Sequence, residues 1–116
     1  MFFEFDTLVS SCYHAGMKND VVYGWENEDT KAIFQAVLKL KNIKECEDFF
    51  RDILTLHEIE EMAERFKIAK MLDKGMSYLE IADKVKASTT TVSRVAHWLK
   101  HGRGGYRMIL DRTAKS

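Results

Sequence analysis

Residues 76–99, MSYLEIADKVKASTTTVSRVAHWL, have the pattern of two short helices joined by a bend of three residues. Apolar residues recur on each side of the bend at the three- and four-residue spacings of a helix. In the first helix, from about residue 78 to 85, the apolar positions are Leu79, Ile81, Ala82 and Val85. The second helix begins at Ser88, whose hydroxyl is placed to cap it, and is expected to bury Val92, Val95 and Leu99. The pattern predicts a pair of short helices that pack on one core.

The polar side chains of the second helix are mostly hydroxyls, followed by an arginine and a histidine. A helix start of this composition suits a groove of nucleic acid better than a protein core. We therefore predict a DNA-binding helix-turn-helix over about residues 77–99. The residues expected to contact double-stranded DNA are Lys86, Ser88, Thr89, Thr90, Thr91, Ser93, Arg94, His97 and Lys100. The alternative is that the hydroxyls are ordinary residues of a helix start, where they are common.

The distribution of charge favours a nucleic-acid partner, although the formal net charge of the whole chain is zero. Residues 1–74 contain 10 Lys and Arg against 15 Asp and Glu, whereas residues 75–116 contain 8 against 3. The basic part coincides with the predicted helix-turn-helix, as binding to a polyanion requires. Chance clustering of charge on a solvated face is the alternative.

The rest of the chain is also predicted to be helical, because it contains no proline and is rich in helix-forming residues. Apolar spacing and capping signals place further helices at about residues 28–41, 43–53, 55–74 and 106–113. Three helix starts combine a capping residue with an acidic residue three positions later: Asn42 with Glu45, Thr55 with Glu58, and Ser77 with Glu80. Gly75 is expected to end the long helix in a left-handed conformation. The prediction is an all-α domain of six helices over residues 26–116.

Two features point beyond this domain. Residues 1–25 form an N-terminal extension that either packs on the domain or a partner chain, or lies upstream of a native start at Met17. The large side chains of Phe34, Phe49 and Phe50 exceed what a single domain of this size buries alone. We therefore expect a homodimer, which would also place two recognition helices about one duplex turn apart.

Composition and motifs exclude several other classes. Cys12 and Cys46 are too few for a disulfide framework and fit a reducing cytoplasm. No apolar run reaches the roughly 18 residues of a membrane span, and the N-terminus lacks the pattern of a secretory signal, so we expect a cytoplasmic protein. His97 and His101 have no further ligands at metal-binding spacing. No phosphate loop or nucleophile motif indicates an enzyme.

From residue 54 to 100 the chain, LTLHEIEEMAERFKIAKMLDKGMSYLEIADKVKASTTTVSRVAHWLK, resembles the Trp repressor family in its YerC/YecD-like branch. The resemblance rests on the LTxxE start of the long helix, on Arg65 near its middle, on GxS before the helix-turn-helix, and on TTTVSR in the second helix. It implies a six-helix fold, an intertwined homodimer and a role as a transcriptional repressor.

The resemblance also implies a possible effector pocket formed by Arg65, Arg94, Val95 and Trp98. The family holds L-tryptophan between two arginines, which match Arg65 and Arg94, and it requires a glycine and a serine where this chain has Val95 and Trp98. We therefore do not expect L-tryptophan to be the corepressor, and no other cofactor is indicated. Trp98 is expected to fill the volume of the ligand. The arginines would then pair with carboxylates such as Glu61 or Glu64.

The positions at which the family contacts DNA bases also differ in this chain. Leu79 and Ala82 stand where the repressor's first helix has basic residues, and Thr89 and Thr90 replace a small apolar helix start, so a different operator is expected. Lys86 occupies the position where a helix-turn-helix bend usually has glycine, and is expected to adopt a positive φ. The operator and the regulated genes do not follow from the sequence. The alternatives are a DNA-binding accessory factor without an effector, and a protein–protein adaptor that retains the helix-turn-helix shape.

Overall fold

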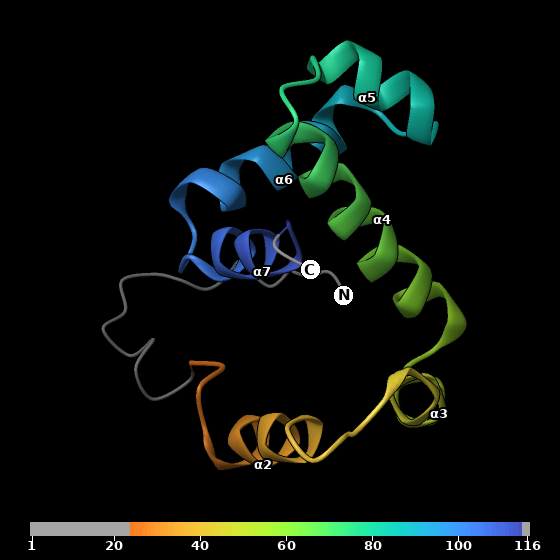
Figure 1. The fold of residues 1–116 in the computed structure, drawn as a ribbon, viewed down its shortest axis with the longest axis vertical. Helices are drawn as coiled ribbons and strands as arrows, with labels where there is room; N and C mark the ends of the chain where they lie inside the picture. Colours follow the sequence, from red (N-terminus) through yellow and green to blue (C-terminus); the bar gives the residue numbers. More distant parts are fainter. Residues whose placement is uncertain (1–23, 115–116) are drawn as a thin grey trace. The chain divides into compact units, whose positions relative to one another are not determined.

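The computed structural model describes residues 24–114, and these residues form six helices without any strand. They are α2 (Glu28–Val37), α3 (Ile43–Ile53), α4 (Leu56–Asp73), α5 (Tyr78–Val85), α6 (Thr89–His101) and α7 (Gly105–Ala114), as labelled in Figure 1. The predicted all-α, six-helix fold is therefore confirmed. The chain divides into two units, residues 1–47 and 48–116. Most of the predicted N-terminal extension, including Met17, lies outside the described residues.

Side-chain caps start the helices where the sequence predicts them. Thr55 with Glu58 and Ser77 with Glu80 form reciprocal capping boxes at the starts of α4 and α5. Asn42 accepts a hydrogen bond from the Glu45 N–H at 2.9 Å, but the Glu45 carboxylate accepts from the Lys41 N–H, so the predicted reciprocal bond to Asn42 is wrong. The acidic side chain reaches one residue further back than in a capping box.

Helix α2 starts with a capping box that the sequence reasoning missed and ends earlier than predicted. Asn27 and Thr30 exchange bonds of 3.0 Å between each side chain and the other residue's N–H. The helix ends at Val37 instead of near residue 41, because Lys39 and Leu40 donate to carbonyls three residues back. This tighter 3₁₀ pattern closes the helix.

The turn between α4 and α5 has the predicted left-handed glycine. Gly75 has a φ of 88°. Its N–H donates to the Leu72 carbonyl at 3.0 Å, and the Met76 N–H donates to the Met71 carbonyl at 3.3 Å. This pair of bonds is a Schellman motif, which satisfies the last carbonyls of α4 and fixes how the chain enters α5.

The core of the unit 48–116 is assembled from four helices. Its buried apolar side chains are Ile68 and Ala69 of α4, Ile81 of α5, Val92, Val95 and Ala96 of α6, and Leu110 of α7. Leu99 is partly buried against this cluster. Leu79 was grouped with the apolar positions of the first helix, but it is 75% exposed and does not join the core. No helix in the described part of the chain is long and apolar enough to span a membrane.

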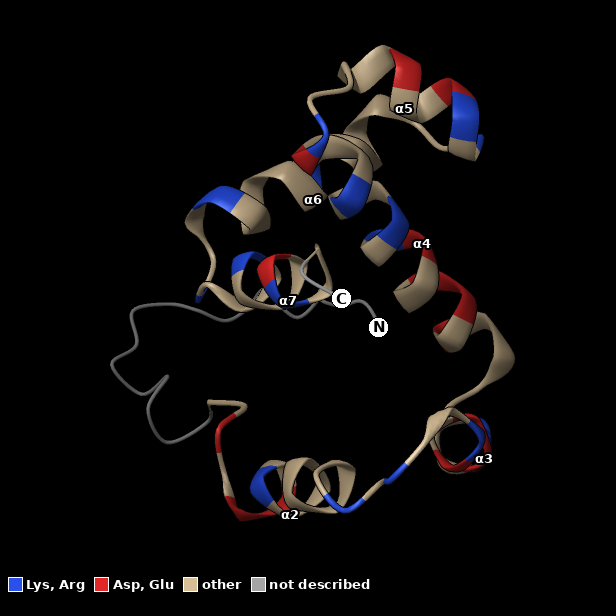
Figure 2. Cartoon of the chain, viewed as in Figure 1, with Lys and Arg blue, Asp and Glu red and all other residues tan. Residues whose placement is uncertain are grey.

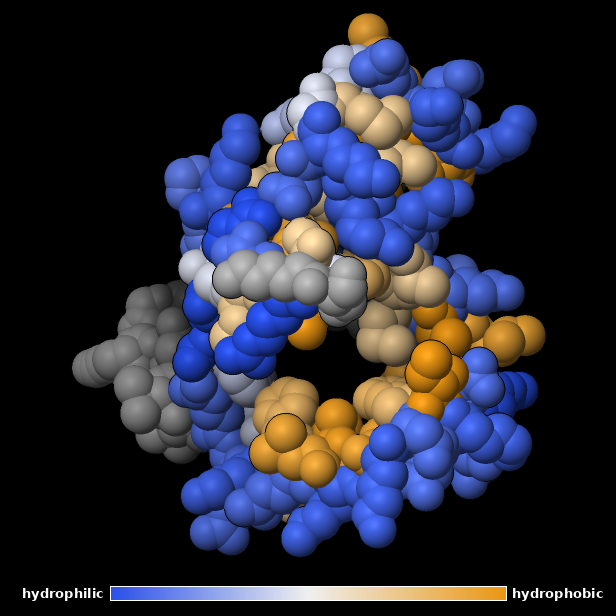
Figure 3. All heavy atoms as spheres, in the orientation of Figure 1, coloured by the Kyte–Doolittle hydropathy of each residue, from blue (hydrophilic) through white to orange (hydrophobic). Residues whose placement is uncertain are grey.

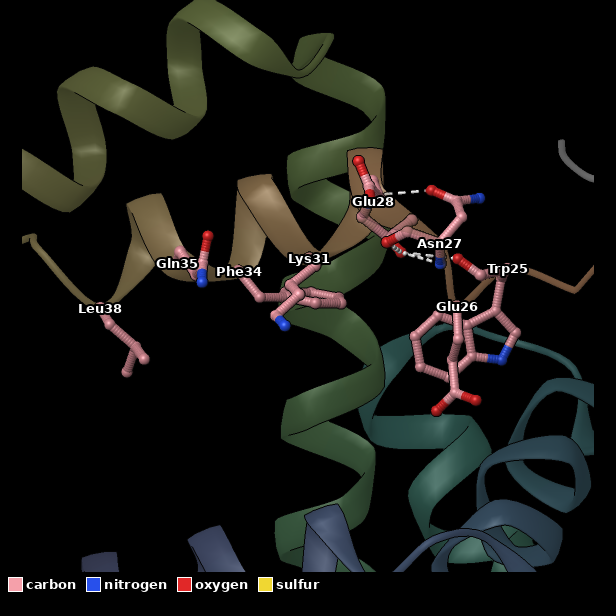
Figure 4. A pocket seen from close by; sticks show the side chains of 9 residues that line it. Trp25, Glu26, Asn27, Glu28, Lys31, Phe34, Gln35 and Leu38 are labelled. Atoms are coloured by element: carbon pink, nitrogen blue, oxygen red, sulfur yellow. Dashed lines mark hydrogen bonds between the residues drawn. The ribbon is translucent and has the colours of Figure 1, made fainter.

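Helices α2 and α3 bury none of their described residues within one chain. Leu38, just after α2, is 85% exposed and Ile43, at the start of α3, is 76% exposed. Hydrophobic side chains gather over α2 in Figure 3. A groove of about 790 Å³ runs along α2, and Figure 4 shows the side chains that line it, among them Trp25, Phe34 and Leu38. Water-exposed apolar surface of this kind favours association with another surface.

Candidate nucleic-acid interface

Helix α6 has a polar stripe on the face opposite its buried residues. Val92, Val95 and Ala96 point into the core, and Leu99 continues the same face. Thr90, Arg94, His97 and His101 are all exposed and follow one another at spacings of four, three and four residues. These spacings place them on one side of a helix, about half a turn away from the core-facing residues. We call these four residues the α6 stripe.

The bend between α5 and α6 has a lysine in a left-handed conformation. Lys86 adopts the expected left-handed conformation with φ of 58° and ψ of 41°, and its N–H donates to the Ala82 carbonyl. The Ala87 N–H donates to the same carbonyl at 3.0 Å. A lysine in this conformation costs roughly 1 kcal/mol relative to glycine. The bend therefore keeps a cation at the start of α6 at some expense in stability.

The predicted hydroxyl cluster divides into two groups. Ser88 caps α6 by accepting from the Thr91 N–H at 3.1 Å, and the two side-chain oxygens lie 3.1 Å apart. Ser88 and Thr91 are therefore engaged in building the helix start. Thr89, Thr90 and Ser93 are exposed instead. These three hydroxyls are free to meet a groove or a phosphate.

The cations around the stripe are available for an anionic partner. Lys86, Arg94 and Lys100 are exposed, and none of them forms an ion pair within residues 24–114. Helix α4 adds a feature that the sequence reasoning missed, because its charge changes sign along its length (Figure 2). Its first half contains Glu58, Glu60, Glu61 and Glu64, and its second half contains Arg65, Lys67 and Lys70 before the final Asp73. All of α4 belongs to residues 1–74, whose net charge is negative, so the total for that part does not reveal the basic residues in the second half of the helix.

The aromatic residues of α6 cluster at its C-terminal half. The His97 ring lies edge-on to Trp98 with 4.9 Å between centroids, and 5.2 Å from the ring of His101. His101 was not among the predicted DNA contacts, although its spacing from Arg94 and His97 already indicated the same face.

The four residues predicted to form an effector pocket have different surroundings within one chain. A cleft of about 450 Å³ between α4 and α7 is lined by Met62, Arg65, Phe66, Gly105, Tyr106 and Ile109, so Arg65 alone of the four lines it. Val95 is 3% exposed and belongs to the core. Trp98 is 59% exposed. That Trp98 fills the volume of the ligand stays a prediction, because Trp98 does not line this cleft in a single chain.

Arg65 does not form the ion pair with Glu61 or Glu64 that the sequence analysis predicts. Glu61 lies 3.1 Å from the His57 ring, and no ion pair joins Arg65 to Glu61 or Glu64 among the described residues. Tyr106 lines the same cleft as Arg65. Burial raises the pKa of Tyr106, and the charge of Arg65 partly opposes that rise.

Comparison with known proteins identifies the family. Residues 28–114 match the family model described as Trp repressor protein. The uncharacterised Bacillus subtilis protein YerC is 40% identical over 84 residues, which cover 72% of this chain and 81% of that protein.

Two solved structures agree with this match. A TrpR-like protein from Eubacterium eligens has a TM-score of 0.74 at 42% identity, covering 77% of this chain and 92% of that one. A Trp repressor candidate from Staphylococcus aureus has a TM-score of 0.74 at 36% identity, covering 85% of this chain and 96% of that one. The chain belongs to the Trp repressor family.

Proposed function

We propose that this protein is a sequence-specific DNA-binding transcription regulator, acting as a homodimeric repressor in the cytoplasm. The observation that carries the proposal is the α6 stripe, in which Thr90, Arg94 and His97 lie opposite the buried Val92 and Val95. A recognition helix needs one face held rigidly by a core and the other face able to donate hydrogen bonds to base edges and phosphates. Membership of the Trp repressor family supports the same role.

Support for the dimer comes from α2 and α3. Neither helix buries a residue within one described chain, and Leu38, Phe34 and Ile43 expose large apolar side chains. A second copy that covered these side chains would remove from water Leu38 and Ile43, the two large apolar residues with the highest exposed fractions among the described residues. Twofold symmetry would then present two copies of the α6 stripe to a palindromic site.

We propose further that no small-molecule cofactor is required and that L-tryptophan is not the corepressor. Val95 occupies the position where the resemblance requires glycine, and its side chain is packed in the core against α4 and α5. Trp98 stands where the resemblance requires serine and cannot supply that hydroxyl. Both substitutions remove features that would hold the amino acid.

The experiment that tests the function is selection of bound sequences from a random pool of DNA duplexes by the purified protein. We expect enrichment of a palindromic site with half-sites about 10 base pairs apart. Enrichment of no sequence despite tight binding would contradict the repressor and favour the DNA-binding accessory factor. Absence of any binding would favour the protein–protein adaptor.

Charge reversal tests the surface that carries the proposal. Arg94→Glu combined with Lys86→Glu should weaken binding to the selected duplex by at least tenfold and reduce the slope of log affinity against log salt. Lys39→Glu, which reverses an exposed cation just after α2, is the matched control and should leave that slope nearly unchanged. Equal effects of the two variants would contradict the assignment of DNA binding to α6.

A further inference from the structure

His97 and His101 place two imidazole rings on the exposed side of α6, near the end of the helix. Their spacing of four residues makes them neighbours on one face, and their ring centroids lie 5.2 Å apart. Neither ring forms an ion pair among the described residues. Both lie opposite the core-facing Val92 and Val95, so the packing of α6 does not require them.

The separation of the two rings suits a shared metal ion. Two imidazoles that bind one tetrahedral Zn²⁺ at Zn–N distances of about 2.1 Å have ring centres roughly 5 Å apart. The same spacing of four residues on a helix supplies two histidine ligands in zinc metalloproteases. Those enzymes have a glutamate directly after the first histidine, where this chain has Trp98. The pair therefore fits a site that binds an ion without catalysing hydrolysis.

The end of α6 holds His101 in this register. The Gly102 N–H donates to the Trp98 carbonyl at 2.9 Å, so the helical hydrogen bonds continue to the last residue of α6, His101. Gly102 suits this end of the helix, because a Cβ at this position would collide with the Trp98 carbonyl oxygen. An ordered helix end lowers the conformational entropy that two side chains lose when they bind one ion.

Two protein ligands leave coordination positions of the ion open. The described part of the chain contains no group of three or more His, Cys, Asp or Glu side chains that could hold a metal ion. The remaining ligands would therefore come from water or from a bound partner. Arg94 and Lys100, each three residues from His97, oppose a cation in the free protein. Duplex DNA would offset this repulsion with its phosphates and offer oxygen ligands.

We propose that His97 and His101 form a two-ligand site for Zn²⁺, and that the bound ion strengthens the binding of DNA to the α6 stripe. The second part rests on the proposed function and adds a regulating ion to it. The ion adds two positive charges to a surface that faces a polyanion. Because the two binding free energies are linked, DNA strengthens the binding of Zn²⁺ by the same factor.

The zinc site is tested first without DNA, by NMR of the histidine rings in the full-length protein. We expect Zn²⁺ to shift the ring signals of His97 and His101 together. In His101→Gln the shift at His97 should be largely lost at the same Zn²⁺ concentration, because chelation needs both rings. His57→Gln is the matched control, because His57 is also exposed and contacts Glu61 four residues later; the paired shifts should persist. Equal shifts at His97 in wild type and His101→Gln would overturn the proposal.

The effect on DNA is measured as affinity for the selected duplex in Zn²⁺ and in the same concentration of Mg²⁺, which prefers oxygen ligands. We expect Zn²⁺ to tighten binding by the wild type about fivefold, as one further pair of opposite charges about 4 Å apart in water implies. His101→Gln should bind equally in both ions. If Zn²⁺ leaves the wild type unchanged, or affects His101→Gln equally, the proposal is overturned while DNA binding stands. If the wild type binds no duplex, the proposed function and the regulating role fail, and the ring signals still decide the zinc site.

Discussion

Arg107 at the start of α7 donates to Asp73 at the end of α4, with 2.8 Å between Nη1 and Oδ1. The same guanidinium contacts Asp111 through Nη2 at 2.9 Å and through Nε at 3.1 Å. Asp73 is the last residue of α4, two positions before the Gly75 turn that leads into the helix-turn-helix. The ion pair thus joins α7 to the end of α4, just before the turn into α5 and α6, the helices that we propose read DNA.

This ion pair predicts a loss of stability in acid. The hydrogen bond from Arg107 lowers the pKa of the Asp73 carboxyl. A carboxyl whose pKa is lower in the folded state stabilises the fold above its unfolded pKa of about 3.9, and this contribution is lost as the pH falls through the lowered value. Arg107→Gln should therefore lower the urea midpoint at pH 7 by a small amount, and the difference from wild type should shrink toward pH 2.

The control for the acid prediction is Lys67→Gln, which removes an exposed cation from α4 that makes no ion pair among the described residues. Its urea midpoint should follow that of the wild type at both pH values. A difference between Arg107→Gln and wild type that stayed constant down to pH 2 would show that Asp73 is not the titrating group.

The sequence determined most helix boundaries because their signals are local. A capping residue and its partner lie three positions apart, as Ser77 and Glu80 do, and the bonds observed are those that the spacing predicts. The predicted start of α2 at about residue 28 is confirmed, but its capping box was missed because Thr30, instead of an acidic residue, completes it. Its end was misplaced because the apolar period continues through Leu38 and Leu40 after the hydrogen bonds have changed.

The candidate site was harder to predict because it depends on which side of each helix meets its neighbours. Leu79 and Ile81 are both apolar and two residues apart, yet one is exposed and the other is buried. Residues two positions apart in a helix point in nearly opposite directions, so only one of them can face the core. Trp98 illustrates the same limit, because its residue type suggested burial and yet its place on α6 leaves it 59% exposed within one chain.

The left-handed bend predicts that Lys86→Gly stabilises the fold. Glycine adopts a φ of 58° without the steric cost that lysine bears, so the free energy of unfolding should rise by up to about 1 kcal/mol. Urea denaturation measures this gain, and affinity for the selected duplex should fall at the same time because a cation is lost. Gly75→Ala is the converse control, because φ there is 88° and alanine should destabilise the fold. A less stable Lys86→Gly variant would contradict the prediction.

The exposed apolar side chains of α2 and α3 predict the effect of charge on assembly. Leu38→Glu or Ile43→Glu would place a carboxylate where we propose that a second copy packs, and an unpaired charge is strongly disfavoured there. Either variant should sediment as a monomer at concentrations at which the wild type is a dimer. Lys39→Glu, next to Leu38 and also exposed, should remain dimeric. If Leu38→Glu and Ile43→Glu both form dimers as stable as those of the wild type, this face is not the dimer interface.

The burial of Val95 predicts that L-tryptophan does not control DNA binding. Its side chain lies within the core cluster with Ile81 and Val92, so room for an indole at this position would require displacement of packed side chains. Affinity for the selected duplex should be the same with and without millimolar L-tryptophan, and calorimetric titration should detect no heat of binding. Val95→Gly tests whether the side chain is the obstacle. If this variant binds L-tryptophan, the steric explanation is supported, whereas binding by the wild type would contradict it. If neither protein binds, Trp98 becomes the remaining difference from the family pattern, and Val95→Gly combined with Trp98→Ser should then restore binding.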